Sequence, residues 1–296
     1  MKDNSIQFKR QRELGEIITD TFKFFRENYK ALFKALIKNV GPFFLILVAA
    51  TIYYNYSTLG SLASGELFKT FDTGMGLGNL FASMAFLIVS ILIYYALLYG
   101  TILNFIKDYI QNDGAISQSN ISHQVKYTFW ELIGLGVVSS IILFLGLALC
   151  VIPGIYVMVP LTLVFAILIF EKKDILGSIS HSFQLIKSNW WMSFITIFIF
   201  GILLYIIGLV VQIPMFMYTF VKAFTISSEI SQGDPRSMFD WVYVTLSVIS
   251  NVFQYLLYIF YAIMTAFLYF NLNERKNYTG TIETIDNIGN RSNSEL

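Results

Sequence analysis

The side chains of this chain that could carry out chemistry are few and lie far apart in the sequence. There are two histidines, His123 and His181, and a single cysteine, Cys150. A zinc site needs several converging ligands, and the sequence has neither a His-Glu-x-x-His run nor a cysteine pair. A Gly-x-Ser-x-Gly element is also absent. We therefore expect no catalytic residue, no metal and no cofactor, and we interpret both histidines as polar positions on solvated helix rims.

Cys150 lies within an apolar run. A lone cysteine cannot form a disulfide framework, and a cysteine among apolar residues usually behaves as a small hydrophobic side chain. We expect it to be buried.

A charged run, Glu171-Lys172-Lys173-Asp174, follows one apolar block directly. One interpretation is the charged end of a membrane span. The other is a basic cluster that contacts lipid headgroups or a partner, since basic residues beside an anionic leaflet contribute about 1 kcal/mol each. The candidate contacts in this second interpretation are Lys23, Arg26, Lys30, Lys172, Lys173 and Lys187.

Three amides are the polar candidates inside apolar segments: Gln212, Asn251 and Gln254. Asn251 and Gln254 are three residues apart and therefore share one helix face. They fit either hydrogen bonds between helices or contacts with a substrate. A cavity lined by these three residues would favour a transporter.

The composition excludes a soluble enzyme. Of the 296 residues, 56% are hydrophobic and 13% are charged, and the net charge is +1. A soluble domain carries about 25% charged residues, so this chain cannot coat a water-facing surface of its size. The nearly neutral balance also argues against a nucleic-acid partner.

Six apolar blocks predict an all-α polytopic membrane protein, because a spanning helix needs about 20 mostly apolar residues. Residues 1–39 form an N-terminal segment, residues 40–272 a six-span membrane domain and residues 273–296 a polar tail. Only Glu131, at a block edge, carries charge within the blocks. Pro160 and Pro214 are expected to kink their helices. The blocks are 40–56, 81–105, 129–151, 154–170, 190–214 and 242–272.

Three connections have their own signals. Ile152-Pro153-Gly154 predicts a tight hairpin between the third and fourth blocks. Residues 57–79 are rich in Gly and Ser and predict a flexible external loop, and the polar stretch 227–236 is expected at the outer interface.

The distribution of Lys and Arg predicts the orientation. With the N-terminus inside, seventeen of these residues lie on the cytoplasmic side and three outside. The positive-inside rule then places both termini in the cytoplasm.

Residues 12–38 predict an amphipathic helix lying at the membrane surface. The expected apolar arc consists of Leu14, Ile18, Phe25, Tyr29, Leu32 and Leu36. The expected polar face consists of Arg12, Glu16, Lys23, Lys30 and Lys34.

The pattern of residues 18–29 returns at residues 179–190 and, more faintly, at residues 121–127. Each copy precedes apolar blocks, which predicts three parallel repeats of an interfacial helix and two spans. The alternative is that three interfacial helices converged on similar sequences.

Short motifs along the chain resemble one family. They are Leu14-Gly15-Glu16-Ile17, Pro153-Gly154-Ile155-Tyr156, the run Ser182 to Trp191 and the run Tyr269 to Arg275. Together they are similar to the glycerophosphoryl diester phosphodiesterase membrane-domain family of prokaryotic polytopic proteins. His181 stands where the family pattern has Arg. The resemblance implies a membrane location and topology, but no activity, because the chain has no room for the catalytic barrel of about 250 residues that some relatives carry.

We therefore expect a non-enzymatic module that binds membrane lipids or a membrane or cytoplasmic protein. The alternatives are a transporter or permease for a small or lipidic solute and, less favoured, a membrane enzyme.

Overall fold

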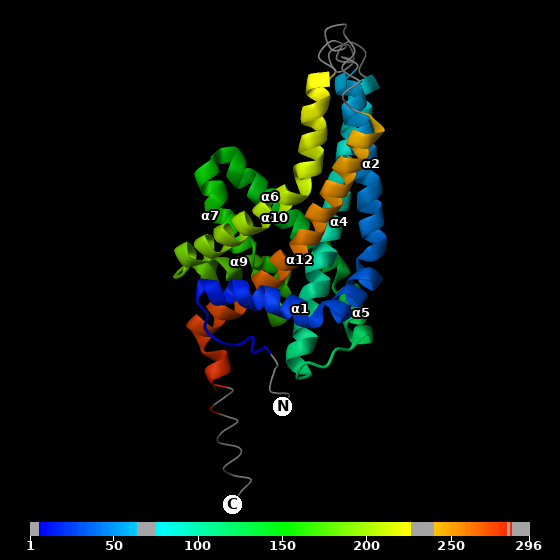
Figure 1. Ribbon diagram of the computed structural model, residues 1–296. Coiled ribbons are helices and arrows are strands. Elements are labelled where there is room, and N and C mark those ends of the chain that lie inside the picture. The colour runs from blue at the N-terminus through cyan, green and yellow to red at the C-terminus, as the bar shows by residue number, and fades with distance from the viewer. Residues whose placement is uncertain (1–5, 64–74, 226–239, 283–284, 286–296) are drawn as a thin grey trace, which may run out of the picture. The chain divides into compact units, whose positions relative to one another are not determined.

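The computed structural model describes residues 6–63, 75–225, 240–282 and 285, and these residues form helices without strands. The helices, labelled in Figure 1, are α1 (Leu14–Asn39), α2 (Gly41–Ala63), α4 (Met75–Gln111), α5 (Gln118–Tyr127), α6 (Phe129–Leu149), α7 (Val151–Leu161), α8 (Val164–Glu171), α9 (Ile175–Ile186), α10 (Trp190–Thr225) and α12 (Trp241–Asn277).

The chain divides into two compact units. The first unit contains Met1–Val40, Ala96–Gly201 and Ile259–Leu296, and the second contains Gly41–Tyr95 and Ile202–Tyr258. The candidate site lies wholly within the first unit.

The expectation of an all-α polytopic protein is confirmed. Within the described residues, five helical segments are long and apolar enough to cross a membrane: Gly78–Gln111, Phe129–Leu149, Val151–Glu171, Trp190–Thr225 and Trp241–Asn277. The number is six if the bent pair Leu14–Asn39 and Gly41–Thr58 forms one more span.

Helix α1 is amphipathic, as predicted, but its buried face is rotated from the predicted arc. Ile17 and Phe24 are buried, whereas Tyr29 is exposed. The helix starts with a capping box in which the backbone N–H of Glu13 donates to the Glu16 carboxylate at 2.9 Å.

Arg12 is the largest departure from the predicted polar face, because its side chain is 0% exposed. The N-terminal strap, residues 6–13, packs within the first unit instead of lying in solvent. Phe8 of the strap stacks on Phe267 with ring centroids 4.5 Å apart, and the Arg12 backbone N–H donates to the Asn271 side-chain oxygen at 2.8 Å. Helical periodicity predicts which residues share a face of one helix. It does not predict how a segment that precedes the helix packs against other helices.

The turn between α6 and α7 lies at Cys150, two residues before the predicted hairpin, and the green ribbon reverses there in Figure 1. Pro153 occupies the first turn of α7, where its missing N–H costs nothing. Gly146 and Gly154 let the two helices approach, since a Cβ on Gly146 would meet the Gly154 Cα at 3.3 Å. Cys150 is exposed, so the expectation of a buried cysteine is wrong.

The helix is interrupted at Pro160, where a kink is predicted: α7 ends at Leu161 and α8 begins at Val164. Proline has no N–H to donate to the carbonyl four residues earlier, which belongs to Tyr156. The Trp190 indole N–H donates to that carbonyl at 3.2 Å, and the Trp190 and Tyr156 rings stack. Trp190 thereby satisfies the backbone group that Pro160 leaves without a donor.

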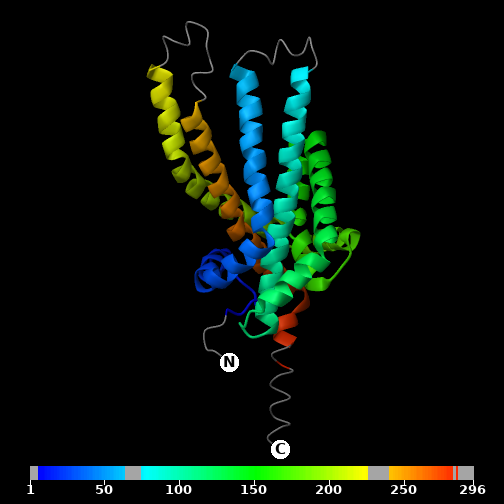
Figure 2. The same cartoon turned by 90° about the vertical axis from the view of Figure 1, so that its right-hand side faces the viewer.

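In the second unit, α2 in blue and the first part of α4 in cyan run antiparallel (Figure 2). The Tyr94 hydroxyl donates to the Tyr255 carbonyl at 3.0 Å, and the Thr51 hydroxyl lies 3.1 Å from the Tyr255 hydroxyl. These bonds satisfy polar groups buried among apolar side chains.

The three repeat segments are all helical: α1, α5 and α9 each precede a long apolar helix. Their relation as parallel repeats stays a prediction. Residues 64–74 of the predicted external loop and the stretch 227–236 lie outside the described residues.

The first part of the predicted tail is packed. Glu274 is buried, and its carboxylate accepts hydrogen bonds from Gly280 at 2.7 Å and from the Thr281 backbone N–H at 3.0 Å. Gly280 lies against the strap so closely that a Cβ would meet the Lys9 carbonyl oxygen at 2.3 Å.

Candidate functional site

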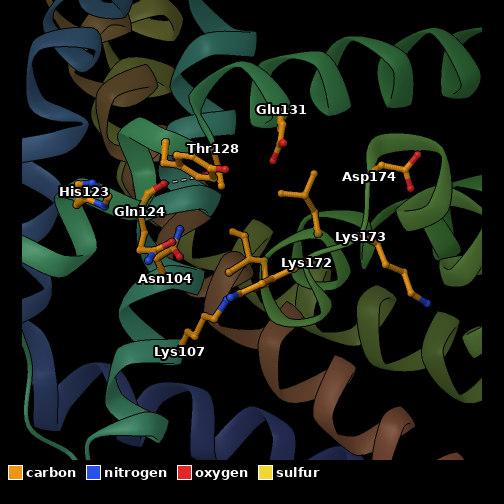
Figure 3. A pocket seen from close by; sticks show the side chains of 12 residues that line it. Asn104, Lys107, His123, Gln124, Thr128, Glu131, Lys172, Lys173 and Asp174 are labelled. Atoms are coloured by element: carbon orange, nitrogen blue, oxygen red, sulfur yellow. Dashed lines mark hydrogen bonds between the residues drawn. The ribbon is translucent and has the colours of Figure 1, made fainter.

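The candidate site is a cavity of about 560 Å³ in the first unit. Its walls come from the C-terminal part of α4, from α5, from the first turn of α6 and from the connection between α8 and α9 (Figure 3). The lining residues are Asn104, Lys107, His123, Gln124, Tyr127, Thr128, Glu131, Leu168, Ile169, Lys172, Lys173 and Asp174.

Two lysines form the basic part of the cavity. The Lys107 ammonium donates to the Ile169 carbonyl near the end of α8, which is one of the terminal carbonyls that a helix leaves without a partner. Lys172 ends α8 and has φ 55°, the left-handed conformation that normally favours glycine. A non-glycine residue in this conformation is strained by about 1–2 kcal/mol.

Lys173 differs from the other two lysines because a carboxylate neutralises it. Its ammonium lies 2.9 Å from a Glu171 oxygen. In Figure 3 its side chain extends away from Lys107 and Lys172. Among the described residues, Lys172 takes part in no salt bridge.

Two carboxylates line the same cavity. Glu131 lies in the first turn of α6 and is exposed. Asp174 caps the N-terminus of α9, where its Oδ1 accepts from the Gly177 backbone N–H at 3.2 Å. Figure 3 draws these two side chains in its upper part and Lys107 and Lys172 below them. The cavity therefore presents both signs of charge, together with the amides of Asn104 and Gln124.

Glu171, the last residue of α8, is the centre of a second polar cluster. It accepts from the Tyr269 hydroxyl at 3.0 Å and lies 3.2 Å from the His181 Nε2. Burial lowers the pKa of the His181 imidazole, and the neighbouring Glu171 carboxylate does not fully offset this effect. His181 is therefore neutral at pH 7 and donates from Nε2, so it is a structural hydrogen-bond partner instead of a solvated rim position.

A smaller cavity of about 280 Å³ lies on the other side of Lys107. Aromatic side chains of Phe170, Tyr269 and Phe270 line it, with Lys9 of the strap. Lys107 lines both cavities.

The structure brings together only part of the predicted basic cluster. Lys172 and Lys173 line the larger cavity, whereas Lys23, Arg26, Lys30 and Lys187 line neither cavity. Arg26 and Lys30 are exposed on α1, and Lys187 is exposed at the end of α9.

The three predicted intramembrane amides lie in the second unit and are half-buried. The Asn251 amide donates to the Ser247 carbonyl at 2.8 Å, which is a bond within α12. The Gln254 oxygen lies close to Gly208 of α10, where a Cβ would meet it at 2.7 Å. Neither of the two cavities is lined by Gln212, Asn251 or Gln254.

Sequence reasoning did not single out Lys107, Asn104 or Glu131 as site residues. One signal was present: Asn104 and Lys107 are three residues apart at the polar end of an apolar helix, and so share one face. What the sequence could not supply was the fold that places α5, α6 and the α8–α9 connection around that face.

The fold and the cavity define an all-α polytopic membrane protein with a mixed-charge cavity inside one compact unit. Among the described residues, no group of three or more His, Cys, Asp or Glu side chains could hold a metal ion. No family model, curated protein or solved structure matches the chain. The resemblance to the glycerophosphoryl diester phosphodiesterase membrane-domain family therefore stays a prediction.

Proposed function

We propose that this chain is a non-enzymatic, multi-pass protein of a bacterial cytoplasmic membrane that binds the phosphate group of a membrane lipid. The cavity that holds Lys107 and Lys172 carries the proposal. Both lysines stand at the end of long apolar helices, where a lipid headgroup meets water. Basic pockets between membrane helices are a known way of holding phospholipid headgroups.

The backbone conformation of Lys172 is a second observation that supports the proposal. A lysine occupies a left-handed position at which glycine would relieve strain. Strain that persists at a cavity lining motivates a functional hypothesis. A binding role for the ammonium group accounts for a lysine at this position.

The test is Lys172→Gly, which removes the ammonium and suits the backbone. We expect phospholipid binding to fall about 5- to 30-fold, corresponding to the loss of about 1–2 kcal/mol. The free energy of unfolding should rise by up to about 1 kcal/mol, because the left-handed strain disappears. Native mass spectrometry of retained lipid and thermal unfolding in detergent measure the two effects.

Lys126→Gln is the matched control, because Lys126 is exposed on α5 and lines neither cavity. It should leave lipid binding unchanged. Lipid retention by Lys172→Gly equal to that of the wild type would contradict the proposal, and a co-purified polypeptide in place of lipid would point to a protein partner.

The transporter alternative finds less support. A transporter would be favoured by a cavity lined by Gln212, Asn251 and Gln254, but these three residues line neither of the two cavities. The bonds of Asn251 within its own helix fit packing better than substrate contact.

The proposed orientation has both termini in the cytoplasm, and Cys150 tests it. It is the single cysteine of the chain and is exposed at the α6–α7 turn. The Lys and Arg bias places this turn outside. A membrane-impermeant maleimide added to intact cells should therefore label Cys150. Labelling only after the cells are lysed would reverse the orientation, and Cys150→Ser gives the background.

A further inference from the structure

The larger cavity carries both signs of charge, and this feature limits the chemical class of ligand that it can bind. Its basic part consists of Lys107 and Lys172, and its acidic part of Glu131 and Asp174. Lys173 adds little, because Glu171 pairs with it at 2.9 Å. Two lysines and two carboxylates therefore line one cavity, and their formal charges cancel.

A purely anionic headgroup does not fit this balance. Its phosphate would gain from Lys107 and Lys172 but would be repelled by Glu131 and Asp174, since like charges at close range are unfavourable. A ligand with a phosphate at one end and an ammonium at the other would satisfy both parts. Each carboxylate can accept several hydrogen bonds, and the capping bond of Asp174 uses only Oδ1.

We infer that the cavity binds a zwitterionic aminoethyl phosphodiester, with the phosphate against Lys107 and Lys172 and the ammonium against Glu131 and Asp174. This inference rests on the proposed function, because it specifies the headgroup that the site takes. A cavity of about 560 Å³ is in the range of small-molecule sites. The same chemistry occurs in phosphatidylethanolamine and in its soluble relative, glycerophosphoethanolamine.

Two conservative variants remove the acidic part with little structural cost. Asp174→Asn keeps the cap of α9, because asparagine caps helices as well as aspartate does. Glu131→Gln keeps the length of an exposed side chain. The double variant should therefore fold and retain the lysines that hold the phosphate.

The experiment measures lipid retained by the full chain from equimolar phosphatidylethanolamine and phosphatidylglycerol, by native mass spectrometry in detergent. We expect the wild type to prefer phosphatidylethanolamine by about fivefold, which corresponds to one ammonium–carboxylate ion pair of about 1 kcal/mol. In the double variant the preference should disappear, while phosphatidylglycerol is retained as well as before or better. An unchanged preference in the double variant would overturn the inference.

Phosphatidylcholine provides a second arm, because its quaternary ammonium cannot donate hydrogen bonds to carboxylates. It should be retained less than phosphatidylethanolamine, and equal retention would overturn the assignment of an ammonium donor. Glycerophosphoethanolamine is the soluble arm and should compete only weakly. Binding of this compound as tight as that of the lipid would overturn the assignment to a membrane lipid.

The Lys172→Gly variant separates this inference from the proposed function. If it loses both lipids while the acidic variants keep the wild-type preference, the phosphate site stands and the ammonium site fails. If it retains both lipids, the proposed function itself fails.

Discussion

Replacement of Asp20 by alanine should lower the free energy of unfolding by about 3–5 kcal/mol, the cost of leaving a buried charge without its partner. The Arg12 side chain is 0% exposed, and its Nε lies 2.9 Å from the Asp20 Oδ2. Arg12 also donates to the Phe8 carbonyl at 2.7 Å and lies over the Phe267 ring at 4.7 Å. Without Asp20, these groups hold the guanidinium in place but do not neutralise it. Thermal or denaturant-induced unfolding in detergent measures the loss.

A double-mutant cycle isolates the buried pair. In an Arg12→Met background, Asp20→Ala should cost less than about 1 kcal/mol, because only the half-exposed pair of Asp20 with Arg10 remains. If Asp20→Ala lowers the free energy of unfolding equally in the two backgrounds, Arg12 and Asp20 do not stabilise the fold through their interaction.

The same pair gives stability a definite pH dependence. Burial raises the pKa of Asp20, but the hydrogen bonds and charges of Arg12 and Arg10 outweigh burial and hold this pKa below its ordinary value. The unfolded chain therefore binds a proton at Asp20 at a higher pH than the folded chain does. The contribution of Asp20 is complete above the unfolded pKa near 4 and is lost as pH falls through the folded pKa. The melting temperature of the wild type should fall as the pH falls from about 5 to about 2. A melting temperature that stays constant over this range would contradict the predicted pH dependence.

The helices of the membrane domain could be predicted because each depends on its own sequence. Blocks of about 20 apolar residues identify spans without knowledge of their neighbours. The kink at Pro160 could be predicted for the same reason, because it depends on the proline itself. The turn at Cys150 was displaced by two residues because Pro153 is compatible with both a turn and the first turn of a helix.

Features that depend on contacts distant in sequence could not be predicted. Arg12 is followed by an amphipathic helix and was assigned to its polar face, yet its partners include Asn271, 259 positions away. Nothing in the local pattern of either segment indicates this contact. His181 was also placed on a solvated rim, but the connection between α8 and α9 brings it to Glu171, ten residues earlier in the chain.

The residues of the candidate site also divide into those with a local sequence signal and those that only the fold brings together. Lys172 and Lys173 were singled out because they end an apolar block, which is a local signal. The approach of Lys107 to the end of α8 requires the tertiary fold, because Ile169 lies 62 positions away. The acidic part of the cavity, which decides the ligand, joins Glu131 of α6 with Asp174 of α9, and no spacing in the sequence relates them.

Phe8→Ala is the second large expected effect, with a loss of about 3–5 kcal/mol, as for other large buried side chains. Phe8 is 2% exposed, and its ring stacks on Phe267 with an interplanar angle of 6°. The Phe8 ring also contacts the Phe24 ring edge-on, with the ring centroids 5.3 Å apart. Alanine would leave a cavity lined by aromatic rings that are held by three different helices and cannot close around it. Thermal unfolding in detergent measures the loss.

Phe144→Ala is the matched control, because Phe144 is 70% exposed and should change stability by less than about 0.5 kcal/mol. We also expect the strap to open locally without global unfolding. Lys9, Arg10 and Arg12 make it a trypsin substrate once it leaves the aromatic cluster. Phe8→Ala should therefore speed cleavage at these residues even below the melting temperature, since proteolysis follows the population of the open form. Unchanged cleavage together with unchanged melting would mean that the Phe8 ring does not hold the strap.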